Sequence, residues 1–341
     1  MQRSHPNGKR GIAHDRWRTE KTRGIHHITA FAGSAQANLD FYAGVLGLRL
    51  VKKTVNFDAP HVYHFYYGDE RGTPGTVMTF FPFEDGRQGR VGGGQVGRIR
   101  FAAPPGSLPF WEDRLSRYGV EHERIRRFGG EAIRFRDHEG LQLELEEQAA
   151  GKPIRWSFAG IPADKAVKGF AGALLYSIAP ARTMQLLERL FGFVRIGEEG
   201  GVVRFRTNDG PGDGLGDSVD VYASPVGYGR GGLGTVHHIA MRAADKDEQE
   251  RWRKRVLEAG FDPTPIVDRN YFTSIYFRDA GGILFEIATD GPGFERDEPF
   301  DRLGSALMLP PWYEPHRSTI ERLLSEAGVR EPVPPGERAD E

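Results

Sequence analysis

The sequence contains no cysteine, which excludes disulfide bonds, thiolate metal ligands and a cysteine nucleophile. It also lacks an apolar run long enough to span a bilayer. Its 46 basic residues nearly balance 47 acidic ones, so no general field attracts nucleic acid or an anionic membrane. We therefore expect a cytoplasmic protein that acts on a small molecule through histidine and carboxylate chemistry.

Two short segments each carry a pair of adjacent histidines at the start of a strand-like run: GIHHITAF (24–31) and TVHHIAM (235–241). With 11 histidines in 341 residues, chance gives about 0.3 such pairs. The two matching contexts indicate duplicated metal-ligand positions. Because side chains alternate along a strand, we expect one imidazole of each pair to face a cavity and its neighbour to face away.

A third candidate ligand is Glu286, in the apolar run GGILFEIAT (281–289). A carboxylate in such a run is costly to bury unless it is paired or bound to a metal. Two histidines and one carboxylate leave coordination positions open, as in non-haem Fe(II) oxygenases. The alternative is a structural role, in which a single histidine on a strand is a hydrogen-bonded packing residue.

The chain also repeats itself in its two halves. WEDRLSRYG (111–119) parallels WRKRVLEAG (252–260), and the strands that follow place Glu144 opposite Glu286. Each segment is typical of a helix stopped by glycine and followed by strands. We predict four βαβββ modules, at about 24–83, 94–147, 168–224 and 232–290, and an α+β fold. Module two has Arg98 where module one has His27, and module three has no histidine, so modules one and four are the ones that can build the site.

The predicted organisation has five parts. Residues 1–23 form a disordered N-terminal extension, modules one and two form a first domain (24–147), residues 148–167 are a linker, modules three and four form a second domain (168–290), and a tail with a short helix follows (291–341). Exposed sheet edges favour self-association into a homo-oligomer.

The segments GIHHIT, LDFYAGVLGLRLVKKTVNFD, RNYFTSIYFRDAGGILFEIATDGPGF and LMLPPWYE, together with the repeated modules, resemble the hydroquinone-type ring-cleavage dioxygenases of the vicinal oxygen chelate superfamily. The resemblance covers about 24–327. It implies that the modules pair into cupped mixed β-sheets around a metal, with His27, His238 and Glu286 as ligands of Fe(II). Mn(II) suits the same ligand set.

Five further residues match positions of that family near the metal. The resemblance places His26 and His237 beside the ligands or in the substrate pocket, and Thr29, Arg269 and Tyr276 in the pocket. It implies insertion of O2 into the ring of a small hydroquinone-type (para-diphenol) substrate, next to a hydroxyl-bearing carbon, as in an extradiol-type enzyme. His237 or Tyr276 would move the phenolic proton, and Arg269 would stabilise negative charge.

Several alternatives stay open on the residues alone. The metal could serve a glyoxalase-like lyase or isomerase, although the strand TVMTFFPF lacks the second glutamate of glyoxalase I, or the chain could be a non-catalytic binding protein. Arg269 could pair with Asp268 or Asp279 at the surface, and Tyr276 could belong to the core. His61 and His64, in HVYHFYY, are expected to pack across strands.

Overall fold

The computed structural model describes residues 21–207 and 214–335. The predicted disordered extension, 1–23, lies outside this range except for its last three residues. These three are ordered, contrary to the prediction: Thr22 is 1% exposed, and its backbone N–H donates to the carbonyl of Phe191. Residues 208–213, within the predicted module three, also lie outside the described residues.

The structure contains the four predicted βαβββ modules. Module one comprises β1 (Ile25–Ala32), α1 (Ala35–Leu39), the π-helix η2 (Asp40–Val45), β2 (Arg49–Asn56), β3 (Ala59–Gly68) and β4 (Val77–Pro82). Module two comprises β5 (Gln95–Ala103), α2 (Leu108–Arg117), β6 (His122–Arg127), β7 (Gly130–Arg136) and β8 (Gln142–Glu147). Module three comprises β9 (Gly169–Tyr176), α3 (Pro180–Arg189), β10 (Val194–Glu199), β11 (Val202–Arg206) and β12 (Ser218–Tyr222). Module four comprises β13 (Val236–Ala243), α4 (Lys246–Glu258), β14 (Val267–Asp268), β15 (Thr273–Arg278) and β16 (Leu284–Thr289).

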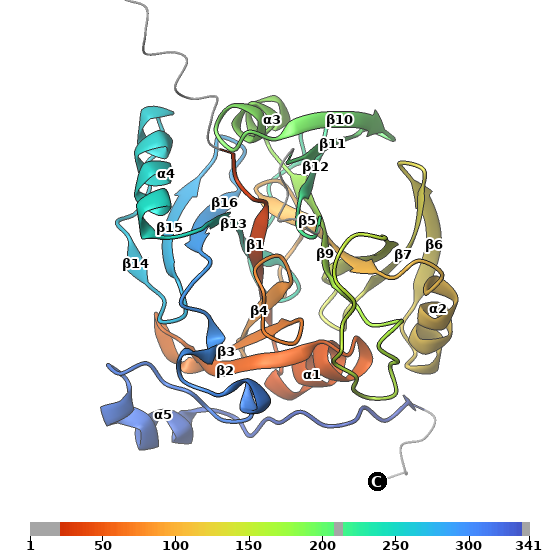
Figure 1. Ribbon diagram of the computed structural model, residues 1–341, viewed down its shortest axis with the longest axis vertical. Coiled ribbons are helices and arrows are strands. Elements are labelled where there is room, and N and C mark those ends of the chain that lie inside the picture. The colour runs from red at the N-terminus through yellow and green to blue at the C-terminus, as the bar shows by residue number, and fades with distance from the viewer. Residues whose placement is uncertain (1–20, 208–213, 336–341) are drawn as a thin grey trace, which may run out of the picture.

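These strands form two curled mixed sheets of eight strands (Figure 1). The first has the order β14-β15-β16-β13-β1-β4-β3-β2, and the second β10-β11-β12-β9-β5-β8-β7-β6. One sheet therefore joins modules one and four and the other joins modules two and three. The predicted domains, 24–147 and 168–290, each therefore contain two modules that lie in different sheets. The antiparallel pairing of β1 with β13 brings the two histidine pairs together, which a pairing of consecutive modules would not do.

Consecutive modules are instead joined through their helices and turns. The Tyr42 hydroxyl of module one donates to Asp137 of module two at 2.8 Å, and Thr183 of α3 donates to Asp279 of module four at 2.5 Å. Residues 148–167, the predicted linker, contain no helix or strand and lead from β8 to β9. Each module therefore has one partner in its sheet and another through its helix.

Alternation along β16 explains how the fold positions an acidic residue. Phe285 and Ile287 are fully buried in the main apolar core, on the side where Trp252 of α4 packs, and Glu286 points the other way. Asp245 is the N-cap of α4, and its side chain accepts a hydrogen bond from the Glu248 N–H. The apolar face of β16 thus fixes the orientation of the carboxylate.

The helical part of module one forms as α1 followed by the π-helix η2. The last carbonyl groups of a helix have no partners within the helix and need them from elsewhere. Arg114 of α2 supplies them, donating to the carbonyls of Val45 at 2.6 Å and Gly44 at 2.8 Å. Module two therefore stabilises the irregular helix of module one.

The C-terminal tail runs beside β2 and β3 (Figure 1). It contains three 3-10 turns, η3 (Phe294–Arg296), η4 (Phe300–Arg302) and η5 (Glu314–His316), and the helix α5 (Arg317–Leu323). The Met308 N–H donates to the Lys53 carbonyl, so the tail covers part of the β2 edge. Across residues 21–207 and 214–335, no helix has the length and apolar character needed to cross a membrane.

Candidate metal centre

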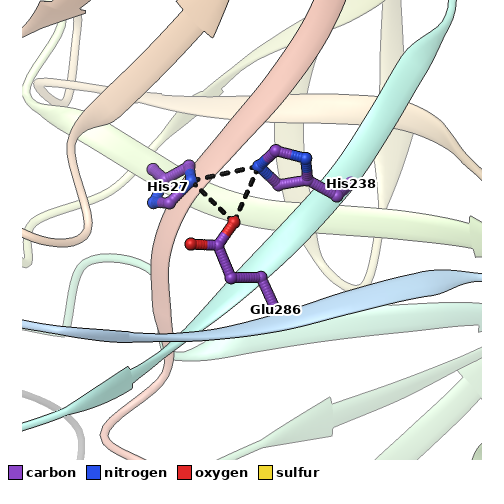
Figure 2. A group of neighbouring side chains, drawn as sticks. All are labelled: His27, His238 and Glu286. Atoms are coloured by element: carbon purple, nitrogen blue, oxygen red, sulfur yellow. Dashed lines mark hydrogen bonds and ion pairs between the residues drawn. The ribbon is translucent and has the colours of Figure 1, made fainter. Parts of the chain in front are cut away.

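Three side chains from three strands converge at one buried point (Figure 2). His27 comes from β1, His238 from β13 and Glu286 from β16, and all are at most 5% exposed. The Nε2 atoms of the two histidines are 3.1 Å apart. Glu286 Oε2 lies 3.3 Å from His27 Nε2 and 2.9 Å from His238 Nε2. Two donors about 2.1 Å from one ion, at a right angle, are about 3 Å apart, so these spacings suit ligands of a single ion.

The chemistry of the three donors also fits a metal. Glu286 Oε1 accepts a hydrogen bond from Ser274, but the buried Oε2 has no hydrogen-bond partner of acceptable geometry although it lies close to both imidazoles. Burial opposes ionisation of Glu286, yet His27 and His238 outweigh it and hold its pKa well below the usual value. Burial lowers the pKa of His238. An ionised carboxylate with a free lone pair beside a neutral imidazole is what a divalent metal requires.

Both histidine pairs contain a β-bulge, which corrects the expectation of strict alternation. The register between β1 and β13 shifts between Ile25 and His27 and again beside His237. Each bulge brings the rings of a pair together: the Nδ1 atoms are 2.8 Å apart in both His26–His27 and His237–His238. The first histidine of each pair thus lies against the Nδ1 side of a candidate ligand.

The two accessory histidines differ in their surroundings. His26 lies outside the cavity lining; its Nε2 is 3.1 Å from the Thr289 carbonyl and its ring packs on Phe272. His237 lines the cavity and contacts Phe31, and burial lowers its pKa to about 3. His26 is therefore placed to orient His27, and His237 is placed to meet a bound molecule.

A cavity of about 210 Å³ opens beside two of the three donors, His27 and His238, which belong to its lining. Four phenylalanines and two tyrosines form about half of its wall, and four histidines and three other polar side chains form the rest. The lining residues are His27, Phe31, Asn56, Phe57, Asp58, His64, Tyr66, Phe81, His237, His238, Arg269, Phe272 and Tyr276. Aromatic walls around a few polar groups suit a small aromatic molecule.

Arg269 and Tyr276 form a polar pair in this wall. The Arg269 Nε donates to the Tyr276 hydroxyl at 3.1 Å, and its Nη1 pairs with Asp58 at 3.0 Å rather than with Asp268 or Asp279. Burial and nearby Glu286 raise the pKa of Tyr276 above its usual value. The tyrosine hydroxyl is therefore held protonated beside a guanidinium, and neither residue belongs only to the core or the surface.

Thr29 lies at the end of a buried chain of hydrogen bonds. Its hydroxyl is 2.7 Å from His238 Nε2 and accepts from the Thr79 hydroxyl at 2.8 Å. Thr79 is 2.9 Å from His64 Nε2, and the Tyr66 hydroxyl is 2.9 Å from His64 Nδ1. A neutral His64 with its proton on Nε2 satisfies every bond in this chain, and the Thr29 hydroxyl then points its proton at His238 Nε2.

Sequence reasoning did not find every residue around the cavity. His64 was expected to pack across strands, but it lines the cavity, whereas His61 is exposed at a neighbouring cavity. Thr79 and Ser274 were also missed, although they hold Thr29 and Glu286. The alternation of HVYHFYY, which sets His64 and Tyr66 on one face, is the signal that could have revealed this wall.

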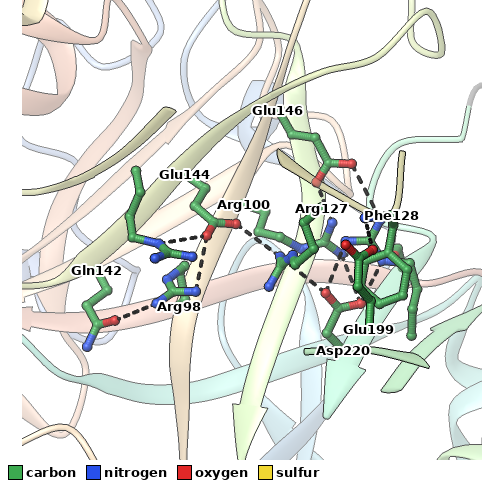
Figure 3. Close-up of polar contacts among 12 residues, drawn as sticks. Arg98, Arg100, Arg127, Phe128, Gln142, Glu144, Glu146, Glu199 and Asp220 are labelled. Carbon is green, nitrogen blue, oxygen red and sulfur yellow. Dashed lines mark hydrogen bonds and ion pairs between the residues drawn. The ribbon is translucent and has the colours of Figure 1, made fainter. Parts of the chain in front are cut away.

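The second sheet carries ion pairs at the equivalent place (Figure 3). Glu144 of β8, which corresponds to Glu286, pairs with Arg98 at 3.1 Å and with Arg127 at 3.1 Å. Fully buried Arg100 pairs with Glu146 at 2.6 Å and with Asp220 at 3.5 Å. Arg98 stands where β1 has His27, and β9 has no histidine, so the second sheet pairs Glu144 with guanidinium groups.

Comparison with known proteins accounts for the repeated architecture. The model of the Glyoxalase/Bleomycin resistance protein/Dioxygenase superfamily matches residues 24–145 and 172–287. The chain belongs to this superfamily. Within it, the glyoxalase I of Zea mays has the same fold, with a TM-score of 0.57 and 12% identity over 78% of this chain and 92% of that one.

Other members of the superfamily are more similar to the chain than this glyoxalase I is, and they are named as dioxygenases. "Putative ring-cleaving dioxygenase MhqO" of Bacillus subtilis is 51% identical over 92% of this chain and 99% of its own length. "Chlorohydroquinone/hydroquinone 1,2-dioxygenase" of Sphingobium indicum is 34% identical over 90% of this chain and 97% of its own length. The crystal structure of a "putative dioxygenase" from Bacillus subtilis matches with a TM-score of 0.89 and 50% identity, over 92% of this chain and all of that one.

Proposed function

We propose that the protein is an Fe(II)-dependent dioxygenase that opens the ring of a hydroquinone. The observation that carries this proposal is the convergence of His27, His238 and Glu286 at a small cavity walled by aromatic side chains. The names of relatives that match nearly the whole chain support it. We place the cleaved bond between a hydroxyl-bearing carbon and its neighbour, which makes the reaction extradiol-type.

The donor set suits Fe(II), and Mn(II) is the alternative metal. Iron held by His27, His238 and Glu286 would supply a Lewis acid and a redox centre for the reaction of the substrate with O2. The three residues contribute one negative charge to a divalent ion, which leaves a net positive centre. That centre favours a substrate bound through a phenolate oxygen, and a buried phenolate would otherwise be costly.

The chain's own residues orient the ring and handle its protons. Phe31, Phe81 and Phe272 line the cavity and exclude water from the ring faces. His237, a neutral imidazole in the wall, accepts the hydrogen bond of a phenolic hydroxyl. Protonated Tyr276, with Arg269 behind it, donates to oxygen as negative charge develops. Thr29, at the other end of the hydrogen-bond chain that begins at Tyr66, donates toward His238.

The test is oxygen consumption by anaerobically iron-loaded protein on addition of hydroquinone, with catechol as the comparison substrate. We expect uptake with hydroquinone and little with catechol, together with the absorbance of a ring-opened product. Iron-free protein and Mn(II)-loaded protein are the controls. If hydroquinone causes no oxygen consumption despite stoichiometric iron, the proposal is contradicted and an oxygen-independent lyase or isomerase is favoured.

A further inference from the structure

The candidate centre is next to a second, larger cavity. The first cavity has a volume of about 210 Å³ and the second about 900 Å³, and Phe31 and His237 line both. Sites for small organic ligands usually measure about 300–1,000 Å³. The first cavity alone is therefore a space for little more than one ring, and the second has the size of a full ligand site.

The inner part of the second cavity is apolar. Val62 and Tyr63 of β3 are buried in its wall, and Phe83 and Leu324 are half-buried there. The charged residues of the lining lie at the exposed rim, and one of them, Glu84, is engaged by the Ala35 N–H and the Ser325 hydroxyl. An apolar chain entering from the ring site would meet hydrocarbon first and charge last.

The tail closes the outer side of this space. Leu323, Leu324 and Ser325, at the end of α5, belong to the lining, and α5 lies against β3 (Figure 1). The Tyr63 hydroxyl donates to the Ser325 carbonyl at 2.9 Å, which fixes the end of α5 to the wall. Leu323, in the same lining, is 61% exposed, so this part of the cavity is open to solvent.

We propose that the natural substrate is a hydroquinone that carries an extended apolar substituent, and that the second cavity binds this substituent. This inference rests on the function proposed above. The ring occupies the first cavity over His27, His238 and Glu286, and the chain passes between Phe31 and His237 toward Phe83 and Leu324. A methyl group stays within the first cavity, so the selectivity begins with longer substituents.

The test compares kcat/KM of the iron-loaded enzyme for hydroquinone and its methyl, propyl and hexyl derivatives. Burial of each methylene beyond the first carbon should raise kcat/KM about fourfold, through KM rather than kcat. A propyl derivative with a hydroxyl at the end of the chain, where the wall is still apolar, should lose most of its gain. If hydroquinone is turned over but longer chains bring no increase, the inference is wrong and the proposed function stands. If hydroquinone itself consumes no oxygen, both fail.

A variant pair gives a second readout that does not depend on turnover. Phe83→Ser places a hydroxyl in the wall of the second cavity, and Phe261→Ser is the control, since Phe261 is a half-buried aromatic that packs on Phe277 elsewhere. Anaerobic calorimetry of hexylhydroquinone binding to iron-free protein should show at least fivefold weaker binding for Phe83→Ser and unchanged binding for the control. Equal affinity in both variants would overturn the assignment of this cavity.

Discussion

Glu286 is the residue on which the candidate centre depends most. It is fully buried and supplies the negative charge of the three-residue set, and its Oε2 makes no hydrogen bond of its own. The histidines can be recognised from their unusual pairing in the sequence, but the carboxylate is recognised only because a charge stands in an apolar strand. The donor arrangement gives each residue a distinct and testable contribution.

Glu286→Gln should remove tight iron binding, because a neutral amide cannot balance the ion as a carboxylate does. We expect at least a hundredfold loss in affinity for Fe(II), with the fold retained because the shape of the side chain is unchanged. Anaerobic titration with a competing chelator measures this affinity. Glu144→Gln, at the equivalent place in the second sheet, is the matched control and should leave iron binding unchanged. Full iron affinity in Glu286→Gln would exclude this carboxylate as a ligand.

Thr79→Val should slow turnover without removing the metal. The substitution breaks the bonds of Thr79 with Thr29 and His64, while a valine keeps the size of the side chain. The bond to Thr29 is the one that positions a group beside the candidate ligands, and the loss of one such hydrogen bond, worth about 1 kcal/mol, corresponds to about a fivefold lower kcat.

Thr79→Ser keeps the hydroxyl and should restore the rate, which separates positioning from packing. Steady-state kinetics with hydroquinone and iron analysis of the same samples provide the comparison. A valine variant with normal kcat would show that the chain from Tyr66 to Thr29 plays no part in turnover.

At the scale of the elements, the same module builds two different centres. β8 and β16 occupy equivalent places, and both carry a buried glutamate. Glycine at 172 of β9 leaves room that Arg100 fills: a Cβ there would lie 2.3 Å from the Arg100 Nη2 and from the Ser218 carbonyl. The second sheet thus satisfies its carboxylates with guanidinium groups that fill the space of a metal site.

Arg100→Ala should destabilise the fold. Arg100 is fully buried, and Asp220 and Glu146, whose pKa values the neighbouring arginines hold below their usual range, would be left without it. Removing one partner of a buried ion pair costs about 3–5 kcal/mol. Urea unfolding measures the change in free energy.

The control for this variant is Arg124→Ala, because Arg124 makes its ion pairs at the surface. Its unfolding free energy should change by less than about 1 kcal/mol. A similar small change for Arg100→Ala would mean that the buried network contributes little to stability.

At the scale of the whole molecule, the tail ties the C-terminal residues to module one. Lys52 is fully buried and pairs with Asp297 and Glu298, both at 2.5 Å. Leu309 and Ile320 pack with Val55 in a separate apolar cluster. The tail therefore packs along the first sheet rather than extending freely from it.

Lys52→Met should loosen this attachment, because it leaves Asp297 and Glu298 without their buried partner. We expect about 3 kcal/mol lower stability and faster cleavage within residues 297–325 in limited proteolysis, followed by mass spectrometry. Lys254→Met, on the exposed face of α4, should leave both unchanged. Equal proteolysis in the two variants would show that the tail does not depend on Lys52.

The sequence predicts more of the local structure than of its assembly. Repeated helix and strand patterns reveal the four modules, and the histidine pairs with Glu286 reveal which three residues meet, because chemistry of that kind is rare in strands. The order of strands in the sheets is not encoded in these local patterns, since β1 and β13 are far apart in the chain. Bulges at His26 and His237 escape prediction for the same reason: they depend on the pairing of two distant strands.

The most direct test of the account is a turnover with 18O-labelled dioxygen. Iron-loaded protein and hydroquinone are mixed anaerobically and are then exposed to labelled O2. Mass spectrometry of the product counts the labelled atoms. The account predicts a ring-opened product that has gained both atoms of O2 and lost none of its own, in wild-type protein and not in Glu286→Gln. Oxidation of hydroquinone to quinone without incorporated label, by protein with full iron content, would contradict it.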